Sequence, residues 1–378
     1  MDPLMINIDT EPPQNSQGSG SRQARSFDSA PLPEKEVLLG WLRQMLLIRE
    51  FEVRTMQGYQ NRLIGGFCHI YIGQEAIAVG TIAAVNPDDP VVLAYRDHGH
   101  ALARGMDPKY CMAEMFGRIG GCAKGKGGSM HMFDAEHYLY GGHGIVGAQT
   151  PLGTGLAFAT KYEDEILHDG KSNHVTLCFM GDGALNQGCF YETMNLASLL
   201  DIPVIFVVEN NRYSMGTSIE RGTSMANDLH VKSEAFGIDH AIVDGKNVTE
   251  LYSQFKPIAD WCRKNSRPYF VEAQTYRYKG HSMSDPRKYR TKDEELVEES
   301  KDCIAFLTTQ LVEEYDVVAD AIKQMTHQVK AQVREAVEWA KNSPETPIEE
   351  LYKDVFTDSW GPFTGTSAPE MLQDRGEA

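Results

Sequence analysis

Gly181-Asp182-Gly183-Ala184 decides the fold of this chain, together with the pair Asn210-Asn211 further along. Each of these polar stretches follows an apolar run typical of a buried strand, at residues 175–179 and 204–208. Neighbouring parallel strands of an open α/β sheet end at the same edge, and such sheets bind their ligands there. One carboxylate with neutral oxygens suits Mg²⁺, which completes its coordination shell with phosphate oxygens. We therefore predict a magnesium-diphosphate site at this edge.

The remaining apolar patterns predict a sheet that is covered by helices on both faces. Residues 35–62 have the apolar spacing of an amphipathic helix. Further helices are expected at residues 73–84, 247–264 and 313–341, and further strands at residues 91–94, 241–243 and 270–274. This alternation is typical of an α/β protein with a mostly parallel, doubly wound sheet. The charged helical segment after residue 293 is expected to pack on the core or on a partner subunit as a C-terminal extension.

The chain of 378 residues divides by composition into three regions. Residues 1–33 are rich in Pro, Ser, Gln and Gly, which predicts a disordered N-terminal tail. Residues 34–300 contain the predicted sheet and are expected to form the α/β domain. Residues 301–378 are expected to form a helical C-terminal region with a flexible end.

The bulk composition argues against several kinds of partner. The net charge of −17 disfavours nucleic acid and anionic membranes, and the sequence has no run of eighteen apolar residues that could span a membrane. The seven cysteines are odd in number and form no C-x-x-C pair, which favours reduced thiols. Acidic residues offset Arg22 and Arg25 near the N-terminus, so a bacterial cytoplasm is expected, with a mitochondrial matrix as the alternative.

Two glycine-rich segments, residues 117–128 and 141–144, are expected to be loops. The first satisfies G-x-x-x-x-G-K at Gly120 and Gly125-Lys126, which is part of a phosphate-binding loop motif. The motif is incomplete because Gly127 stands where Ser or Thr would bind Mg²⁺, and the preceding segment has a helical pattern. A flexible surface loop is the alternative interpretation.

Three further polar segments contain candidate functional side chains. Arg96 follows a predicted strand, where it could bind phosphate oxygens in a fork or form a structural salt bridge. His69 lies among apolar neighbours and could be a buried structural histidine or an acid/base group. His281 lies in a cationic loop, and it could donate a hydrogen bond to a phosphate or remain solvated. The methionines and phenylalanine of residues 130–133 are expected to serve packing.

Several blocks of the sequence resemble a known family. Gly-Asp-Gly followed by Asn-Asn resembles the thiamine diphosphate signature of thiamine-dependent decarboxylases, transketolases and 2-oxoacid dehydrogenases. Longer blocks are similar to the alpha subunits of heterotetrameric pyruvate dehydrogenase components, at residues 66–75, 95–99, 125–132, 140–149, 209–218 and 276–286. The likeness extends from about residue 35 to residue 350.

This resemblance implies a thiamine diphosphate-binding fold with a defined set of ligands. Asp182, Asn211 and the main-chain oxygen of Tyr213 would hold Mg²⁺, and His69 would face the substrate. The residues implied to contact the cofactor are Tyr95, Arg96, Gly144, Val146, Asp182, Gly183, Ala184, Asn211 and His281. Of these implied residues, His69 and His281 are the candidates for catalysis.

The resemblance also implies an activity and its partners. Thiamine diphosphate would act as an electron sink in the oxidative decarboxylation of pyruvate, and the acetyl group would pass to a lipoyl-bearing dihydrolipoyl transacetylase core, leading to acetyl-CoA. A beta subunit would complete an α2β2 heterotetramer and supply the glutamate that activates the cofactor. The isolated chain is therefore expected to be inactive. Ser282 and Ser284 lie in the loop that mitochondrial relatives control by phosphorylation, and Ser282 is the first candidate.

Three other functions are compatible with parts of the sequence. The same chemistry on branched-chain 2-oxoacids or acetoin is the nearest alternative. A Rossmann-type nucleotide-binding oxidoreductase would require a third glycine in phase with Gly153-Thr154-Gly155, which the sequence lacks. A non-catalytic binding subunit is disfavoured because every implied metal and diphosphate ligand is present.

Overall fold

The computed structural model describes residues 25–167 and 173–355. Most of the predicted N-terminal tail and the predicted flexible C-terminal end lie outside these residues, and residues 25–33 form neither helix nor strand. The boundary predicted at residue 300 stays a prediction. No described helix is long and apolar enough to cross a membrane.

A six-stranded sheet with the strand order β2-β1-β3-β4-β8-β7 forms the centre of the molecule, and all of its neighbouring strands pair in parallel. The strands are β1 (Val91–Ala94), β2 (Leu139–His143), β3 (Thr176–Gly181), β4 (Val204–Asn210), β7 (Asp239–Asp244) and β8 (Tyr269–Gln274). The central strands β3 and β4 are buried along almost their whole length, as expected for a parallel sheet covered on both faces. The predicted mostly parallel sheet is therefore confirmed.

One predicted loop is in fact a strand. Residues 141–143 belong to β2 at the edge of the sheet, and the prediction of a loop at residues 141–144 was wrong there. The glycines are needed because a Cβ atom on Gly141 would lie 2.0 Å from the ring of Phe133, and one on Gly142 would lie 1.9 Å from the carboxylate of Asp97. Glycine in this strand therefore marks close packing.

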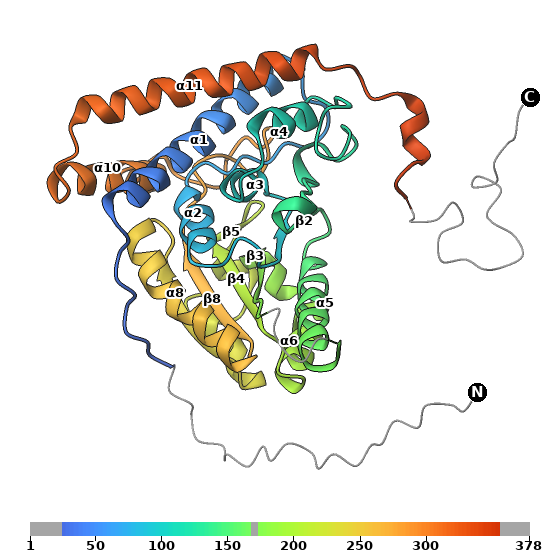
Figure 1. The fold of residues 1–378 in the computed structure, drawn as a ribbon, viewed down its shortest axis with the longest axis vertical. Coiled ribbons are helices and arrows are strands. Elements are labelled where there is room, and N and C mark those ends of the chain that lie inside the picture. Colours follow the sequence, from blue (N-terminus) through green and yellow to red (C-terminus); the bar gives the residue numbers. More distant parts are fainter. Residues whose placement is uncertain (1–24, 168–172, 356–378) are drawn as a thin grey trace, which may run out of the picture.

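Helices cover both faces of the sheet, and each face has its own hydrophobic core (Figure 1). One core includes α2 (Glu75–Ala83) and α8 (Val248–Asn265), and the other includes α5 (Gln149–Tyr162) and α6 (Gly188–Leu199). Along β3, Leu177 and Phe179 face the first core, whereas Cys178 and Met180 face the second. This alternation confirms a doubly wound sheet.

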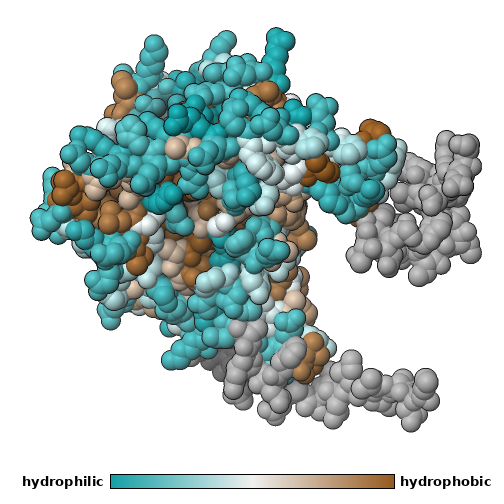
Figure 2. All heavy atoms as spheres, turned by 45° about the horizontal axis from the view of Figure 1, so that its top comes forward, coloured by the Kyte–Doolittle hydropathy of each residue, from teal (hydrophilic) through white to brown (hydrophobic). Residues whose placement is uncertain are grey.

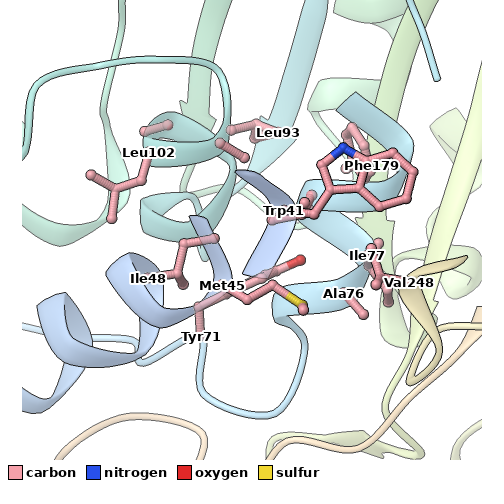
Figure 3. Packing of buried hydrophobic residues seen from close by; sticks show 14 of the residues in the cluster. Trp41, Met45, Ile48, Tyr71, Ala76, Ile77, Leu93, Leu102, Phe179 and Val248 are labelled. Atoms are coloured by element: carbon pink, nitrogen blue, oxygen red, sulfur yellow. The ribbon is translucent and has the colours of Figure 1, made fainter. Parts of the chain in front are cut away.

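An outer group of helices packs against the first core. It contains α1 (Lys35–Gln60), α3 (His98–Ala103), α4 (Pro108–Met115), α10 (Cys303–Glu313) and α11 (Ala319–Asn342). The short helix α9 (Lys292–Glu299) has no buried residue. Figure 3 shows Trp41, Met45 and Ile48 of α1 in this core. Helix α11 lies along α1 and α4 (Figure 1), and the surface over these helices is mainly hydrophilic (Figure 2).

The long C-terminal helix begins later than the sequence pattern indicates. The predicted helix at residues 313–341 starts at Ala319, because the chain leaves α10 and turns at Asp316 with a left-handed φ of 53°. The shorter elements are η1 (Gly128–Met130), η2 (Ala135–His137), η3 (Glu163–Leu167), η4 (Asp182–Asn186), β5 (Tyr213–Ser214), β6 (Thr217–Ser218), α7 (Ile219–Gly222), η5 (Leu229–Phe236) and η6 (Ile348–Tyr352).

The backbone N–H groups of the glycine-rich loop at residues 117–128 bind a carboxylate of the protein, that of Glu114. The buried carboxylate of Glu114 accepts hydrogen bonds from the backbone N–H groups of Ala123, Gly125, Gly127 and Gly128 at 2.7–3.0 Å. The segment before the loop is helix α4, so the strand of a phosphate-binding loop is absent at this place. The loop therefore wraps around Glu114, which explains its glycines without a bound phosphate.

We expect Glu114→Gln to destabilise the protein by about 2–4 kcal/mol, because the amide nitrogen cannot accept hydrogen bonds from buried N–H groups. Thermal or urea unfolding of the variant measures this loss. The exposed Glu335 on α11 provides the matched control, since Glu335→Gln removes a carboxylate that faces solvent. Equal unfolding midpoints for the two variants would contradict the role assigned to Glu114.

Candidate functional site

A cavity of about 330 Å³ lies at the carboxyl ends of β1, β3 and β4. The predicted site residues that line it are His69, Tyr95, Gly144, Val146, Asp182, Gly183, Ala184, Asn211, Tyr213 and His281. These residues come from segments far apart in the sequence, and the parallel sheet brings them to one edge. Among the residues implied to contact the cofactor, Arg96 is the exception, because it is buried and does not line the cavity.

Asp182 provides the negative charge of this cavity. It follows β3 directly, is only 3% exposed, and accepts a hydrogen bond from the hydroxyl of Ser214 at 3.2 Å. Burial raises the pKa of its carboxyl group to about 6, because a charged carboxylate loses solvation there. A bound cation would compensate for that lost solvation, so the environment of Asp182 fits a metal ligand.

The Asn211 side chain is held in one orientation. Its amide nitrogen donates to Gln74 Oε1 at 3.1 Å, and its Oδ1 accepts from the N–H of Tyr213 at 3.3 Å. The buried Arg277 donates from Nη1 to Asn211 Oδ1 at 3.4 Å and to the carbonyl oxygen of Tyr213 at 3.3 Å. The two neutral oxygens predicted as metal ligands are thus held together by one guanidinium group.

These three oxygens form a donor set that suits Mg²⁺. One carboxylate and two neutral oxygens are hard ligands, and Mg²⁺ takes few protein ligands beside phosphate. The described residues contain no group of three or more His, Cys, Asp or Glu side chains placed to hold a metal ion. The cavity therefore fits a hard cation that arrives with a phosphate group.

His281 lines the cavity, and one of its ring nitrogens has no hydrogen-bond partner among the described residues. Its backbone N–H donates to Asp285 Oδ2 at 2.6 Å, whereas its ring nitrogen Nδ1 is buried and has no hydrogen-bond partner among the described residues. Burial, and then the nearby charges of Arg96 and Arg277, lower the pKa of the ring to about 4. A phosphate oxygen would provide the partner that Nδ1 lacks.

Arg96 holds backbone rather than a carboxylate. Its guanidinium group donates to the carbonyl oxygens of Ile70 at 2.7 Å and of His281 at 2.9 Å. No carboxylate of the described residues forms a salt bridge with it, so the structural salt bridge considered for Arg96 is wrong. Arg96 instead forms hydrogen bonds to both backbone segments that contain His69 and His281, and so holds them next to each other.

His69 is buried, 5% exposed, and its ring contacts those of Tyr95 and His281 at centroid distances of 4.7 and 4.9 Å. Its Nδ1 donates to the carbonyl oxygen of His281 at 2.8 Å. Burial, and then the charge of Arg96, lower the pKa of His69 to about 3. The ring is therefore neutral near pH 7, with Nε2 left as the nitrogen available to a ligand.

Further residues of the cavity were given no binding role from the sequence, namely Ala94, Met130, Gln149, Gly181, Gln187, Ser214 and Met215. Ser214 supports Asp182 and also makes glycine necessary at position 183, where a Cβ atom would lie 2.3 Å from its hydroxyl. Met130 lines the cavity although packing was predicted for its segment, whereas Met132 is fully buried in the core. A weak signal existed, because Met130, Gln149, Ser214 and Met215 all lie within the family-like blocks.

Comparison with known proteins agrees with this geometry. The family model described as "Dehydrogenase E1 component" matches residues 43–349. The chain is 46% identical over 324 residues to a protein of Rickettsia bellii named pyruvate dehydrogenase E1 component subunit alpha, covering 86% of this chain and 97% of the relative. Proteins of the same name from Rickettsia felis and Rhizobium meliloti are 47% and 46% identical, covering 86% and 85% of this chain and 97% and 90% of the relatives. The chain therefore belongs to the dehydrogenase E1 component family.

Proposed function

We propose that this chain is the alpha subunit of a pyruvate dehydrogenase E1 component, which oxidatively decarboxylates pyruvate and transfers the acetyl group to a lipoyl domain. The family depends on thiamine diphosphate. The observation that carries the proposal is the single cavity in which the diphosphate, metal and substrate residues implied by the family meet. The relatives named for pyruvate, at 45–47% identity, favour this substrate over branched-chain 2-oxoacids and acetoin.

The described residues fit thiamine diphosphate with Mg²⁺. Asp182, Asn211 and the main-chain oxygen of Tyr213 would hold the metal, and Gly183 and Ala184 would present backbone N–H groups to the diphosphate. His281 and Tyr95 line the same cavity and would meet the phosphate oxygens. The bound cofactor would supply an electron sink for loss of carbon dioxide from a 2-oxoacid.

The substrate end of the cavity is defined by His69. Because Nδ1 is bound to a carbonyl oxygen and the ring is neutral, Nε2 can accept a proton or a hydrogen bond from the substrate. Gly144 and Val146 also line the cavity, and the cofactor rings would lie against them.

A partner subunit is part of the proposal. The name of the relatives, subunit alpha, implies a beta subunit and a complex. We propose an α2β2 heterotetramer that binds a lipoyl-bearing transacetylase core, and a beta-subunit glutamate that activates the cofactor. Exposed hydrophobic side chains support a covering partner, since Phe67, Ile145 and Met215 near the cavity are 67%, 76% and 64% exposed.

We propose that the protein works in a reducing compartment, namely a bacterial cytoplasm, with the mitochondrial matrix as the alternative. All seven cysteines lie in the described residues, and all are free thiols. Fractionation of source cells with an antibody against the chain tests the location, and recovery from an oxidising compartment would contradict it.

Ser282 stays a predicted phosphorylation site. It follows His281 directly, and its hydroxyl lies 3.0 Å from that of Ser284. A phosphate on Ser282 would place negative charge beside the diphosphate site and repel the cofactor or substrate. Intact-mass measurement after incubation with a cognate kinase tests modification of either serine.

We expect Asp182→Asn to weaken binding of Mg²⁺ and thiamine diphosphate by at least about tenfold, since loss of even an outer-shell partner lowers metal affinity about 10- to 100-fold. Calorimetric titration of the assembled αβ protein measures this change. Asp320 on α11 has a side chain that is 78% exposed, and Asp320→Asn is the matched control. Unchanged affinity in Asp182→Asn would remove this residue from the metal site.

The substrate and the need for a partner are tested together. We expect the co-expressed alpha and beta subunits to reduce an artificial electron acceptor with pyruvate at a higher kcat/KM than with branched-chain 2-oxoacids or acetoin. The isolated chain, supplied with thiamine diphosphate and Mg²⁺, should show no turnover. Activity of the isolated chain would refute the dependence on the partner, and a preference for another substrate would refute the choice of pyruvate.

A further inference from the structure

A buried group of three polar side chains lies outside the cavity, and the proposed function gives it no role. His98 Nδ1 donates to Glu52 Oε1 at 3.0 Å, and His98 Nε2 lies 2.9 Å from the hydroxyl of Ser129. The three residues come from α1, α3 and η1, and they are 0%, 0% and 3% exposed. We call Glu52, His98 and Ser129 the buried triad.

The buried triad has the residue types of a hydrolytic active site, but a substrate cannot reach it. None of its three members lines the cavity. A serine nucleophile must reach its substrate, and Ser129 is enclosed by protein. The triad must therefore act on neighbouring protein groups.

Two members of the triad bind the backbone beside His69. The hydroxyl of Ser129 accepts the N–H of His69 at 3.0 Å, and Glu52 Oε1 accepts the N–H of Tyr71 at 2.9 Å. His98 joins these two acceptors from the other side. The N–H groups of His69 and Tyr71 are thus bound by the side chains of Ser129 and Glu52, and His98 contacts both of these side chains.

The segment at residues 69–71 requires such partners. It is buried but belongs to no strand. Its one backbone hydrogen bond among the described residues runs from the N–H of Gln74 to the carbonyl oxygen of Tyr71, so the N–H groups of His69 and Tyr71 depend on side-chain acceptors. A buried N–H group without a partner is costly, and side chains must replace the missing strand. Arg96 binds the carbonyl oxygen of Ile70 at 2.7 Å, so the segment is fixed by side chains on both edges.

The same segment carries the ring of His69 into the cavity. Its Cα position depends on the hydrogen bond from the His69 N–H to Ser129, whereas the ring direction depends on the carbonyl oxygen of His281. A misplacement of about 1 Å at a reacting group can lower the rate about a hundredfold. The geometry of the buried triad is therefore able to control the reaction without touching the substrate.

We propose that Glu52, His98 and Ser129 are positioning residues that set the place of His69 relative to the substrate. This inference rests on the proposed function, in which His69 meets the substrate. Ser129 is the central member, because it contacts both His98 and the backbone of His69.

The test is a double-mutant cycle in the assembled αβ protein. We expect Ser129→Ala to lower kcat/KM for pyruvate about tenfold or more, with the affinity for thiamine diphosphate changed less than about twofold. In the background of His69→Ala, we expect Ser129→Ala to have little further effect, because the group that it positions is gone. Rates are expressed per bound cofactor, so that partial assembly does not enter the comparison.

Ser233 gives the matched control. It is also fully buried in η5, its hydroxyl is within hydrogen-bond distance of the backbone carbonyl oxygens of His230 and Ile238, and it does not line the cavity. Ser233→Ala should leave kcat/KM within about threefold of the wild type. Its hydroxyl lies away from the cavity, so we expect its loss to lower the stability of the protein and not the rate of the reaction. If Ser129→Ala does not assemble, Glu52→Gln replaces it, since it keeps the shape and removes the charge that orients His98.

The outcomes separate the two proposals. Equal losses in Ser129→Ala and Ser233→Ala, or losses that add fully to that of His69→Ala, would overturn the positioning role. A wild-type αβ protein without pyruvate turnover would instead overturn the proposed function. A lower affinity for thiamine diphosphate with unchanged kcat would also overturn the positioning role, because it would place the triad in cofactor binding.

Discussion

Because every strand of the sheet runs parallel to its neighbours, the carboxyl ends of β1, β3 and β4 meet at one edge. Tyr95, Asp182 and Asn211 follow these three strands directly or within one residue. The strands themselves are apolar and buried on both faces, so the polar residues that follow them are concentrated where the hydrogen-bonded ladder stops. The position of the site is a consequence of strand direction.

Burial is the second constraint on this site. Loops at a sheet edge normally leave their backbone groups to solvent, but here several of these segments lie inside the protein. Charged side chains take the place of solvent at three points: Glu114 binds the glycine-rich loop, Arg96 binds the segments of His69 and His281, and Arg277 binds the loop of Asn211. Each of these charged groups forms hydrogen bonds to backbone groups or to a side-chain amide of its loop, and each therefore holds that loop in place.

These buried charges also explain the electrostatics of the cavity. Arg96 and Arg277 are buried and do not line the cavity. Burial is the main cause of the lowered pKa of His281, and the charges of these two arginines lower it further. Burial and then the charge of Arg96 lower the pKa of His69 in the same way. Asp182 is the carboxylate of the cavity, and burial raises its pKa. The cavity thus combines neutral histidines with one carboxylate that lacks a strong cationic partner, which is the arrangement that a metal with a diphosphate would complete.

The sequence by itself determined the parallel α/β sheet and the polar residues that line the cavity at its edge, because both depend on local patterns of apolar and polar residues. The strands around Asp182 and Asn211 lie within one or two residues of their predicted bounds. Only the tertiary structure decided that Gly141 and Gly142 pair in a strand, that Glu114 occupies the glycine-rich loop, and that Ser129 lies against His69. The pair of His69 and Ser129 is separated by 60 positions, and even Glu114 and the loop that it binds are 9 to 14 positions apart, beyond the reach of a helix or turn pattern. The packing of α1, α3 and α4 on the sheet brings these residues into contact, and this packing cannot be predicted from local sequence patterns.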